Sequence, residues 1–197
     1  MHTVWVFITD CGDSAVTVPL ALLTLVFVIA AGAQRLAVGW VLTIGGCAGA
    51  IAVLKLAFGG CGQRISIAHI VSPSGHTAMS AVVYGSLALL LGTALPPRYR
   101  RAVLLAAIVG VVGIALSRVV LHEHSVAEIV VGFAVGAGAV AVFRAILARE
   151  KPPALALSWF VVSIVALITL MHGTRWMIEP VLQAIAEAFR ISQPWCG

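Results

Sequence analysis

The polar side chains that could do chemistry fall mainly in three short segments of the chain. These are Lys55–Arg64 (KLAFGGCGQR), Ser72–His76 (SPSGH) and Ser117–Glu128 (SRVVLHEHSVAE). Each segment adjoins a long apolar run, and an ionisable group at the edge of such a run is costly to keep and is therefore a functional candidate. We take the three segments as candidate parts of one site.

The third segment places a histidine and a carboxylate on one helix face. His124 and Glu128 are four residues apart, so a helix that begins near residue 124 brings their side chains together. A carboxylate bonded to one ring nitrogen leaves the other nitrogen to act as a nucleophile. Arg118 precedes the pair, and its planar guanidinium suits bidentate phosphate binding. The same residues are compatible with a helix-stabilising pair and an arginine that reaches the membrane interface.

The second segment has the composition of a helix start that binds an anion. Pro73 suits the first turn, Ser74 can cap the helix, and Gly75 leaves room for a ligand to approach the backbone amides. Unpaired N–H groups and the helix dipole both favour phosphate at such a position. An ordinary serine-capped helix start would have the same sequence.

The first segment contributes two cations. Lys55 ends an apolar run and Arg64 follows a glycine-rich stretch, so each could simply extend to water. If both instead point to the site, they and Arg118 place three positive charges around a phosphoryl group, whose equatorial oxygens carry charge in the transition state. This set would support phosphoryl transfer without a metal.

The rest of the chain predicts the scaffold. Of the 197 residues, 61% are hydrophobic and 10% are charged, which is typical of an integral membrane protein. Long continuous apolar runs favour helices over barrel strands. We expect an all-α, single-domain bundle of six transmembrane helices, with an interfacial amphipathic helix over residues 174–192. A frayed tail over the same residues is the alternative. The expected spans are residues 14–33, 37–58, 75–95, 102–121, 126–148 and 154–173.

The loop charges predict an orientation. One set of alternate loops contains Arg35, Arg98, Arg100, Arg101, Arg144, Arg149 and Lys151, whereas the ordinary loop or tail cations of the other side are Arg175 and Arg190. The positive-inside rule then places both termini and the three polar segments on the outer face. The net charge of +5 is spread in short groups and not in one tract, so we expect no nucleic-acid partner.

Two further patterns concern packing and redox state. The Gly45-x-x-x-Gly49 and Gly132-x-x-x-Gly136 spacings predict close approach of helix backbones in lipid. Cys47 lies within an apolar run, where packing is its expected role. An oxidising compartment would permit one disulfide among the cysteines near chain ends and loops, which are Cys11, Cys61 and Cys196.

Together, these segments resemble the three-part signature of the type-2 phosphatidic acid phosphatase superfamily. The family's second motif, Pro-Ser-Gly-His, is intact as Pro73 to His76. Its third motif is Ser-Arg, five residues, His, three residues, Asp; here Glu128 stands in place of the Asp. Its first motif is Lys, six residues, Arg-Pro, whereas here eight residues separate Lys55 from Arg64 and Ile65 replaces the proline.

The resemblance implies a role for each matching residue and a class of substrate. His124 would form a phosphohistidine, Glu128 would orient it, and His76 would protonate the leaving lipid oxygen, with no metal or cofactor. The substrate would be a phosphorylated lipid in a bacterial cell membrane, such as an isoprenyl pyrophosphate, phosphatidylglycerophosphate, phosphatidate or lipid A. Phosphate would be bound by Lys55, Arg64, Ser74, Gly75 and Arg118.

Three other functions fit parts of the pattern. A zinc site could use ligands from His76, His122, Glu123, His124 and Glu128, although it would gather cations beside a metal. A transporter could use Arg118, His124 and Glu128 as an ion pathway, although the expected spans contain few ionisable groups near their centres. A phosphotransferase on the same scaffold would pass the phosphoryl group to another lipid instead of to water.

Overall fold

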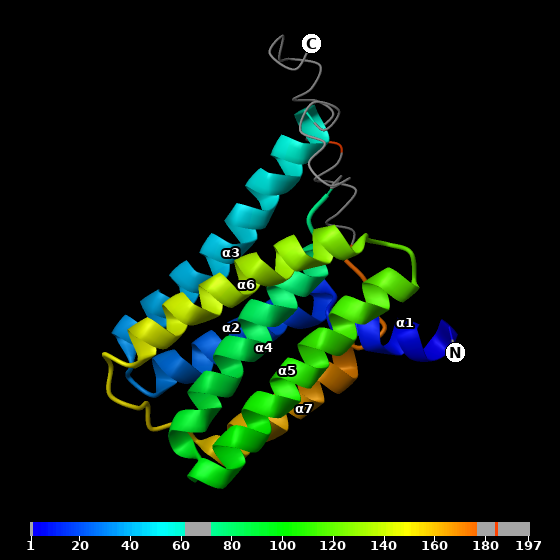
Figure 1. Ribbon diagram of the computed structural model, residues 1–197. Coiled ribbons are helices and arrows are strands. Elements are labelled where there is room, and N and C mark those ends of the chain that lie inside the picture. The colour runs from blue at the N-terminus through cyan, green and yellow to red at the C-terminus, as the bar shows by residue number, and fades with distance from the viewer. Residues whose placement is uncertain (1, 62–71, 177–183, 185–197) are drawn as a thin grey trace.

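The computed structural model describes residues 2–61, 72–176 and 184, with the side chains of residues 59–61 left out. All regular secondary structure in these ranges is helical (Figure 1). The helices are α1 (His2–Asp10), α2 (Ser14–Ala30), α3 (Gln34–Cys61), α4 (Gly75–Ala94), α5 (Pro97–Val120), α6 (Val126–Leu147) and α7 (Leu157–Met171).

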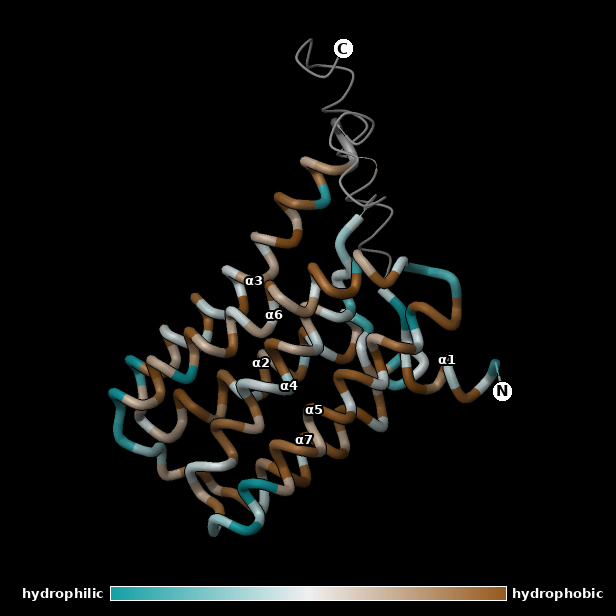
Figure 2. Tube along the Cα trace, in the orientation of Figure 1, coloured by the Kyte–Doolittle hydropathy of each residue, from teal (hydrophilic) through white to brown (hydrophobic). Residues whose placement is uncertain are grey.

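Five helical segments of the described chain are long and apolar enough to cross a membrane. They are His2–Ala30, Gln34–Phe58, Gly75–Ala94, Pro97–Val120 and Val126–Leu147. Figure 2 shows the hydrophobic colours along these helices and the hydrophilic ones mainly at turns and helix ends. Because a bilayer has about 30 Å of hydrocarbon to span and each segment meets that length, the chain is a multi-pass membrane protein.

The expected sixth span is shorter than predicted. The helix α7 has 15 residues, about 22 Å at 1.5 Å per residue, which is less than the hydrocarbon thickness. The helix begins at Leu157, three residues after the expected start of the span at residue 154. Residues 174–176 are not helical, and the remainder of the predicted interfacial helix over 174–192, apart from residue 184, lies outside the described residues.

Two helix boundaries also differ from the sequence prediction. The N-terminal residues, expected as a tail before the first span, form α1 and are joined to α2 by a turn at Cys11–Asp13. The helix α5 begins at Pro97, five residues before the expected start, and includes Arg98, Arg100 and Arg101. Proline is favoured at the first helical position, and charged residues can continue a helix beyond the apolar layer.

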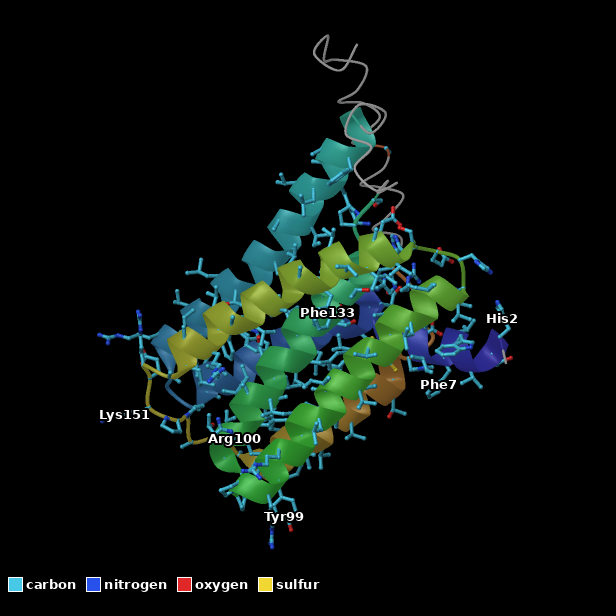
Figure 3. The ribbon with its side chains drawn as sticks, viewed as in Figure 1. His2, Phe7, Tyr99, Arg100, Phe133 and Lys151 are labelled. Carbon is cyan, nitrogen blue, oxygen red and sulfur yellow. The ribbon has the colours of Figure 1, made fainter. Side chains whose placement is uncertain are left out.

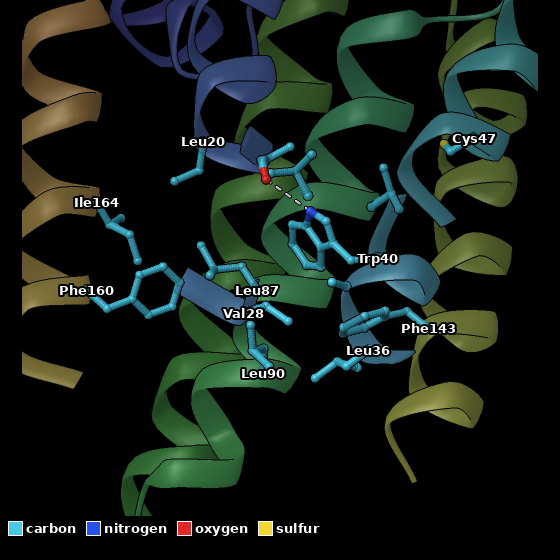
Figure 4. Packing of buried hydrophobic residues seen from close by; sticks show 14 of the residues in the cluster. Leu20, Val28, Leu36, Trp40, Cys47, Leu87, Leu90, Phe143, Phe160 and Ile164 are labelled. Carbon is cyan, nitrogen blue, oxygen red and sulfur yellow. Dashed lines mark hydrogen bonds between the residues drawn. The ribbon is translucent and has the colours of Figure 1, made fainter. Parts of the chain in front are cut away.

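The helix α4 is the centre of the bundle. It contacts α2, α3, α5 and α6, and more than half of its own residues are buried. Figure 4 shows the core beside it, where the Trp40 indole donates a hydrogen bond to the Ala21 carbonyl at 3.0 Å and meets Phe143 edge-on. Cys47 is buried in the same core, as the sequence predicts.

The two glycine pairs have different environments. A Cβ atom on Gly136 would lie 2.6 Å from Ala81 Cβ, and one on Gly132 would collide with the Ser74 carbonyl oxygen. These two glycines therefore let α6 approach α4, as predicted. The prediction for Gly45 and Gly49 is wrong for the described residues, because a Cβ on either would meet nothing within 4 Å.

The two ends of the bundle differ in charge. The α2–α3 turn, the α4–α5 turn and the α6–α7 loop lie at one end, where Figure 3 labels Arg100 and Lys151. The starts of α4 and α6 and the α1–α2 turn lie at the other end (Figure 1). The polar segments that are described therefore meet at the end opposite the basic loops.

Candidate active site

The start of α4 is fixed by a serine cap. Ser74 has an extended backbone, and its hydroxyl oxygen accepts the Thr77 N–H at 3.4 Å and the Thr77 hydroxyl at 3.0 Å. Both side chains are fully buried. The predicted cap is therefore present, and it directs the Ser74 hydroxyl toward the first turn of its own helix. The first residue of that helix is Gly75.

The start of α6 is a capping box. The Ser125 hydroxyl accepts the Glu128 N–H at 3.3 Å, and Glu128 Oε2 accepts the Ser125 N–H at 2.9 Å. This reciprocal arrangement satisfies two amides that would otherwise lack partners. The chain reaches it from α5 through a turn in which His122 adopts a left-handed φ of 57°. Because the box sets the position of Glu128, it also sets the position of whatever that carboxylate holds.

His124 is held by Glu128. Its Nδ1 lies 3.1 Å from Glu128 Oε2, and the two side chains are 10% and 8% exposed. The other carboxylate oxygen, Oε1, accepts the Ser72 N–H at 2.7 Å. Since Glu128 fixes Nδ1, the nitrogen left for chemistry is Nε2, which has no hydrogen bond within the described part of the chain. The added methylene of Glu relative to Asp is accommodated without loss of this contact.

Burial lowers the pKa of His124, which lies in the turn before α6, below its ordinary value of 6.5. The hydrogen bond to Glu128 opposes this change, and the positive charges of Arg118 and Lys55 add to it. A lowered pKa keeps the imidazole neutral at physiological pH, and only the neutral ring has a nitrogen lone pair that can attack.

The starts of α4 and α6 are in direct contact. The Ser74 N–H donates to the Glu128 carbonyl oxygen at 3.1 Å, and Gly132 packs on the Ser74 carbonyl. Lys55, on α3, also approaches the start of α4, because a Cβ placed on Gly75 would lie 3.9 Å from Lys55 Nζ. The Lys55 side chain is buried, so its ammonium lies at the N-terminus of α4 and not in water. The second and third segments and Lys55 are thus brought together.

Arg118 lies at the end of α5, and its guanidinium contacts Thr9 and Glu123. Its Nη1 donates to Thr9 Oγ1 at 3.2 Å, and its Nη2 lies 3.6 Å from the exposed Glu123 carboxylate. Thr9, on α1, was not among the residues expected at the site. It fixes one edge of the guanidinium from a helix far away in the sequence.

His76 contacts a carboxylate that the sequence analysis missed. Its Nε2 lies 3.4 Å from Asp13 Oδ2, with the two side chains 26% and 9% exposed. The signal was present in the sequence, because Asp10 and Asp13 are two acids next to a long apolar run. Such acids are costly at a membrane unless they have partners.

Three further sequence predictions concern Arg64, a metal site and a disulfide. Arg64 lies outside the described residues. Within residues 2–61 and 72–176, no three His, Cys, Asp or Glu residues are placed to hold a metal ion. Cys11 is a free thiol, so the disulfide considered for it is not formed, and the side chains of Cys61 and Cys196 are not described.

Comparison with known proteins identifies the family of the chain. The family model described as the PAP2 superfamily matches residues 59–152, which include the starts of α4 and α6 but neither Lys55 nor Asp13. A protein of Klebsiella pneumoniae, described as an uncharacterized 22.5 kDa protein in the cps region, is 31% identical over 189 residues, covering 93% of this chain and 90% of that protein. No solved structure matches. The chain belongs to the PAP2 superfamily, whose members are generally phosphatases.

Proposed function

We propose that the protein is a metal-independent lipid phosphate phosphatase that works through a phosphohistidine on His124. The observation that carries the proposal is the buried His124–Glu128 pair, in which Glu128 holds Nδ1 at 3.1 Å and Nε2 is left to attack. A nucleophile oriented by a second group is the arrangement that covalent catalysis requires. Superfamily membership supports the same class of activity.

The reaction proceeds in two steps. In the first step, Nε2 of His124 attacks phosphorus, the bond from phosphorus to the lipid oxygen breaks, and protonated His76 gives its proton to that oxygen. In the second step, water attacks the phosphohistidine while His76 accepts a proton from it. Phosphate leaves and both histidines return to their starting states. Either a phosphomonoester or a pyrophosphate would fit this sequence.

Phosphate binding is assigned to the N-terminus of α4 and to the cations around it. Lys55 lies beside Gly75, where the first backbone amides of α4 and the helix dipole favour an anion. Arg118, on α5, supplies a further positive charge, and its guanidinium is held by a hydrogen bond to Thr9. Arg64 and Ser74 stay in the proposed set, Ser74 chiefly through its place at the start of the helix.

An apolar cavity beside the site supports a lipid substrate. It has a volume of about 440 Å³ and lies between α1, α4, α5 and α7, with Ile8, Cys11, Gly110 and Ile114 among its lining residues. Ile114 precedes Arg118 by about one helical turn on α5. A hydrocarbon chain in this cavity would therefore have its phosphorylated end near the proposed phosphate ligands.

The proposed orientation places the site on the outer face of the cell membrane. Arg100 and Lys151 lie at the opposite end of the bundle (Figure 3), and Arg35 follows the α2–α3 turn at that end. The positive-inside rule assigns this end to the cytoplasm. An outward-facing site suits lipids that are dephosphorylated outside the cytoplasm.

The test is phosphate release by the purified protein, with a chelator present, from phosphatidate, phosphatidylglycerophosphate, lipid A and an isoprenyl pyrophosphate. We expect release from at least one of them, and a loss of about 10⁴-fold or more in His124→Ala, because removing a nucleophile removes the covalent route. Unchanged turnover in His124→Ala would refute the nucleophile. Activity abolished by chelator and restored by zinc would favour a metal enzyme, and transfer of phosphate to a second lipid would identify a phosphotransferase. No release from any lipid would leave a transporter as the better explanation.

A further inference from the structure

We propose that Asp13 is a positioning residue for His76, holding its imidazole and stabilising the protonated ring that donates to the lipid oxygen. This inference rests on the proposed function, because it assigns His76 the role of general acid. Nothing in the three polar segments pointed to Asp13, and it lies outside the part of the chain that the family model matches.

The contacts of Asp13 divide between its two carboxylate oxygens. Oδ1 accepts the Ala15 N–H at 2.8 Å and the Trp176 N–H at 3.2 Å. Oδ2 faces His76 Nε2 at 3.4 Å. Two backbone amides therefore fix the rotation of the carboxylate, and its second oxygen is directed at the imidazole.

The turn that carries Asp13 is anchored on the helix that carries His76. The Tyr84 hydroxyl of α4 donates to the Cys11 carbonyl oxygen at 2.6 Å. Gly12 allows the close approach, since a Cβ there would lie 2.5 Å from an Ile114 methyl group and 2.9 Å from the Ser80 hydroxyl. These contacts tie the turn that carries Asp13 to the helix that carries His76, as precise positioning requires.

The chemistry follows from the atoms that face each other. With Nε2–H directed to Asp13, the second ring nitrogen, Nδ1, carries the proton that is transferred, and no hydrogen bond occupies Nδ1 within the described residues. As the bond between phosphorus and the lipid oxygen breaks, the Nδ1–H bond breaks and an O–H bond forms on the leaving lipid. The carboxylate stabilises the imidazolium before the transfer, and the ring is neutral afterwards. Water returns the proton when the phosphohistidine is hydrolysed.

The alternative role for Asp13 is purely structural, because it caps α2 through Oδ1. The cap accounts for Oδ1 but not for the direction of Oδ2. The substitution Asp13→Asn separates the two roles, since Asn is as good an N-cap as Asp and still accepts both amides. It replaces the charged acceptor that faces His76 Nε2 with a neutral amide N–H donor.

The decisive measurement compares two leaving groups in Asp13→Asn and in the wild-type protein. For phosphatidate, whose alcohol needs a proton to leave, we expect kcat/KM to fall by about 10- to 100-fold, part of the 10²–10⁴-fold that general acid catalysis supplies. For p-nitrophenyl phosphate, whose phenolate leaves readily without a proton, we expect little change. The variant His76→Asn should show the same selectivity, and the double variant should lose no more than His76→Asn alone.

A matched control is Asp10→Asn. Asp10 is also a buried acid near the α1–α2 turn, but its partner is Arg175, with Oδ1 to Nη2 at 2.9 Å. We expect both substrates to be turned over by this variant as by the wild type. Equal losses on both substrates in Asp13→Asn, or no loss on either, would overturn the proposal.

A second readout does not depend on turnover. Nitrogen-15 NMR of labelled histidines, with the His76 signal assigned through His76→Asn, reports which ring nitrogen carries the proton. In the neutral form of the ring, recorded above the pH at which His76 loses its second proton, we expect the remaining proton on Nε2 in the wild type and a shift toward Nδ1 in Asp13→Asn. An unchanged spectrum would overturn the pairing. If the wild type hydrolyses neither substrate but the spectrum shifts as expected, the proposed function fails while the Asp13–His76 contact stands.

Discussion

His124 and His76 each face a carboxylate, and the two pairs differ in how the chain forms them. Glu128 is one helical turn from His124, and both side chains are almost fully buried. Asp13 reaches His76 from the turn between two other helices, and His76 is 26% exposed. The His124–Glu128 pair is buried and forms between residues close in sequence at the start of α6, which suits a nucleophile that must keep one orientation. The Asp13–His76 pair joins residues distant in sequence and is partly exposed to water, which suits a group that exchanges protons.

The largest expected difference between the pairs comes from Glu128→Gln. Gln preserves the capping box and the volume but not the charge that fixes the His124 tautomer. We expect kcat to fall by about 10²–10⁴-fold, as when the carboxylate orienting a catalytic histidine is neutralised elsewhere. Both phosphatidate and p-nitrophenyl phosphate should be affected, in contrast to Asp13→Asn. Glu123→Gln is the control, since the Glu123 side chain is 56% exposed and pairs only loosely with Arg118. A loss confined to phosphatidate would mean that the two pairs do not have separate roles.

The pH profile sharpens the comparison next. Burial lowers the pKa of His124 below its ordinary value of 6.5, so the imidazole stays neutral at pH values somewhat below 6.5. We therefore expect kcat/KM to begin to fall only below that ordinary value, by about tenfold per pH unit. The Glu128 hydrogen bond raises the same pKa, so Glu128→Gln should move this acid limb to lower pH. Steady-state kinetics would measure the pH dependence of kcat/KM in the wild type and in Glu128→Gln. A range of about pH 4.5 to 8 brackets the pKa of an ordinary histidine. A limb that moves to higher pH would contradict the assigned cause.

The close contact of α4 and α6 is what puts the two pairs in one site, and Gly132→Ala should loosen it. The new Cβ would collide with the Ser74 carbonyl oxygen, so we expect a loss of about 1–3 kcal/mol in the free energy of unfolding, as for other overpacked sites. Thermal unfolding in detergent would measure the change. Gly49→Ala is the matched control, because nothing lies within 4 Å of its added Cβ, and it should be neutral or stabilising by about 0.5–1 kcal/mol. Equal destabilisation by both would refute the assigned packing difference.

The smallest expected effect concerns Thr9, which holds Arg118 from α1. Thr9→Val keeps the shape but removes the hydroxyl that accepts from Nη1. We expect KM for phosphatidate to rise roughly fivefold, about 1 kcal/mol for one hydrogen bond, with kcat less changed. Thr24→Val is the control, because the Thr24 hydroxyl bonds the Leu20 carbonyl within α2. Should kcat fall and KM stay constant, Thr9 would act on the transition state and not on binding.

The amino-acid sequence by itself determined the local half of the site. Ser125 and Glu128 have capping-box spacing, and His124 is four residues from Glu128, so helix geometry alone brings these side chains together. Ser74 before Gly75 similarly defines the start of α4. The apolar composition indicated the membrane class, because 10% of the residues are charged, whereas a typical soluble domain has about 25%.

Tertiary structure alone decided which distant groups meet. The contacts of Asp13 with His76 and of Thr9 with Arg118 join segments whose spacing along the chain has no characteristic value. The membrane helices are apolar on all sides, so hydrophobic pattern does not reveal which face packs on protein and which on lipid. This is why the glycines at 45 and 49 were expected to pack and do not, whereas those at 132 and 136 do. Asp13 lies next to His76 because of how the helices pack, and its residue type alone did not predict this contact.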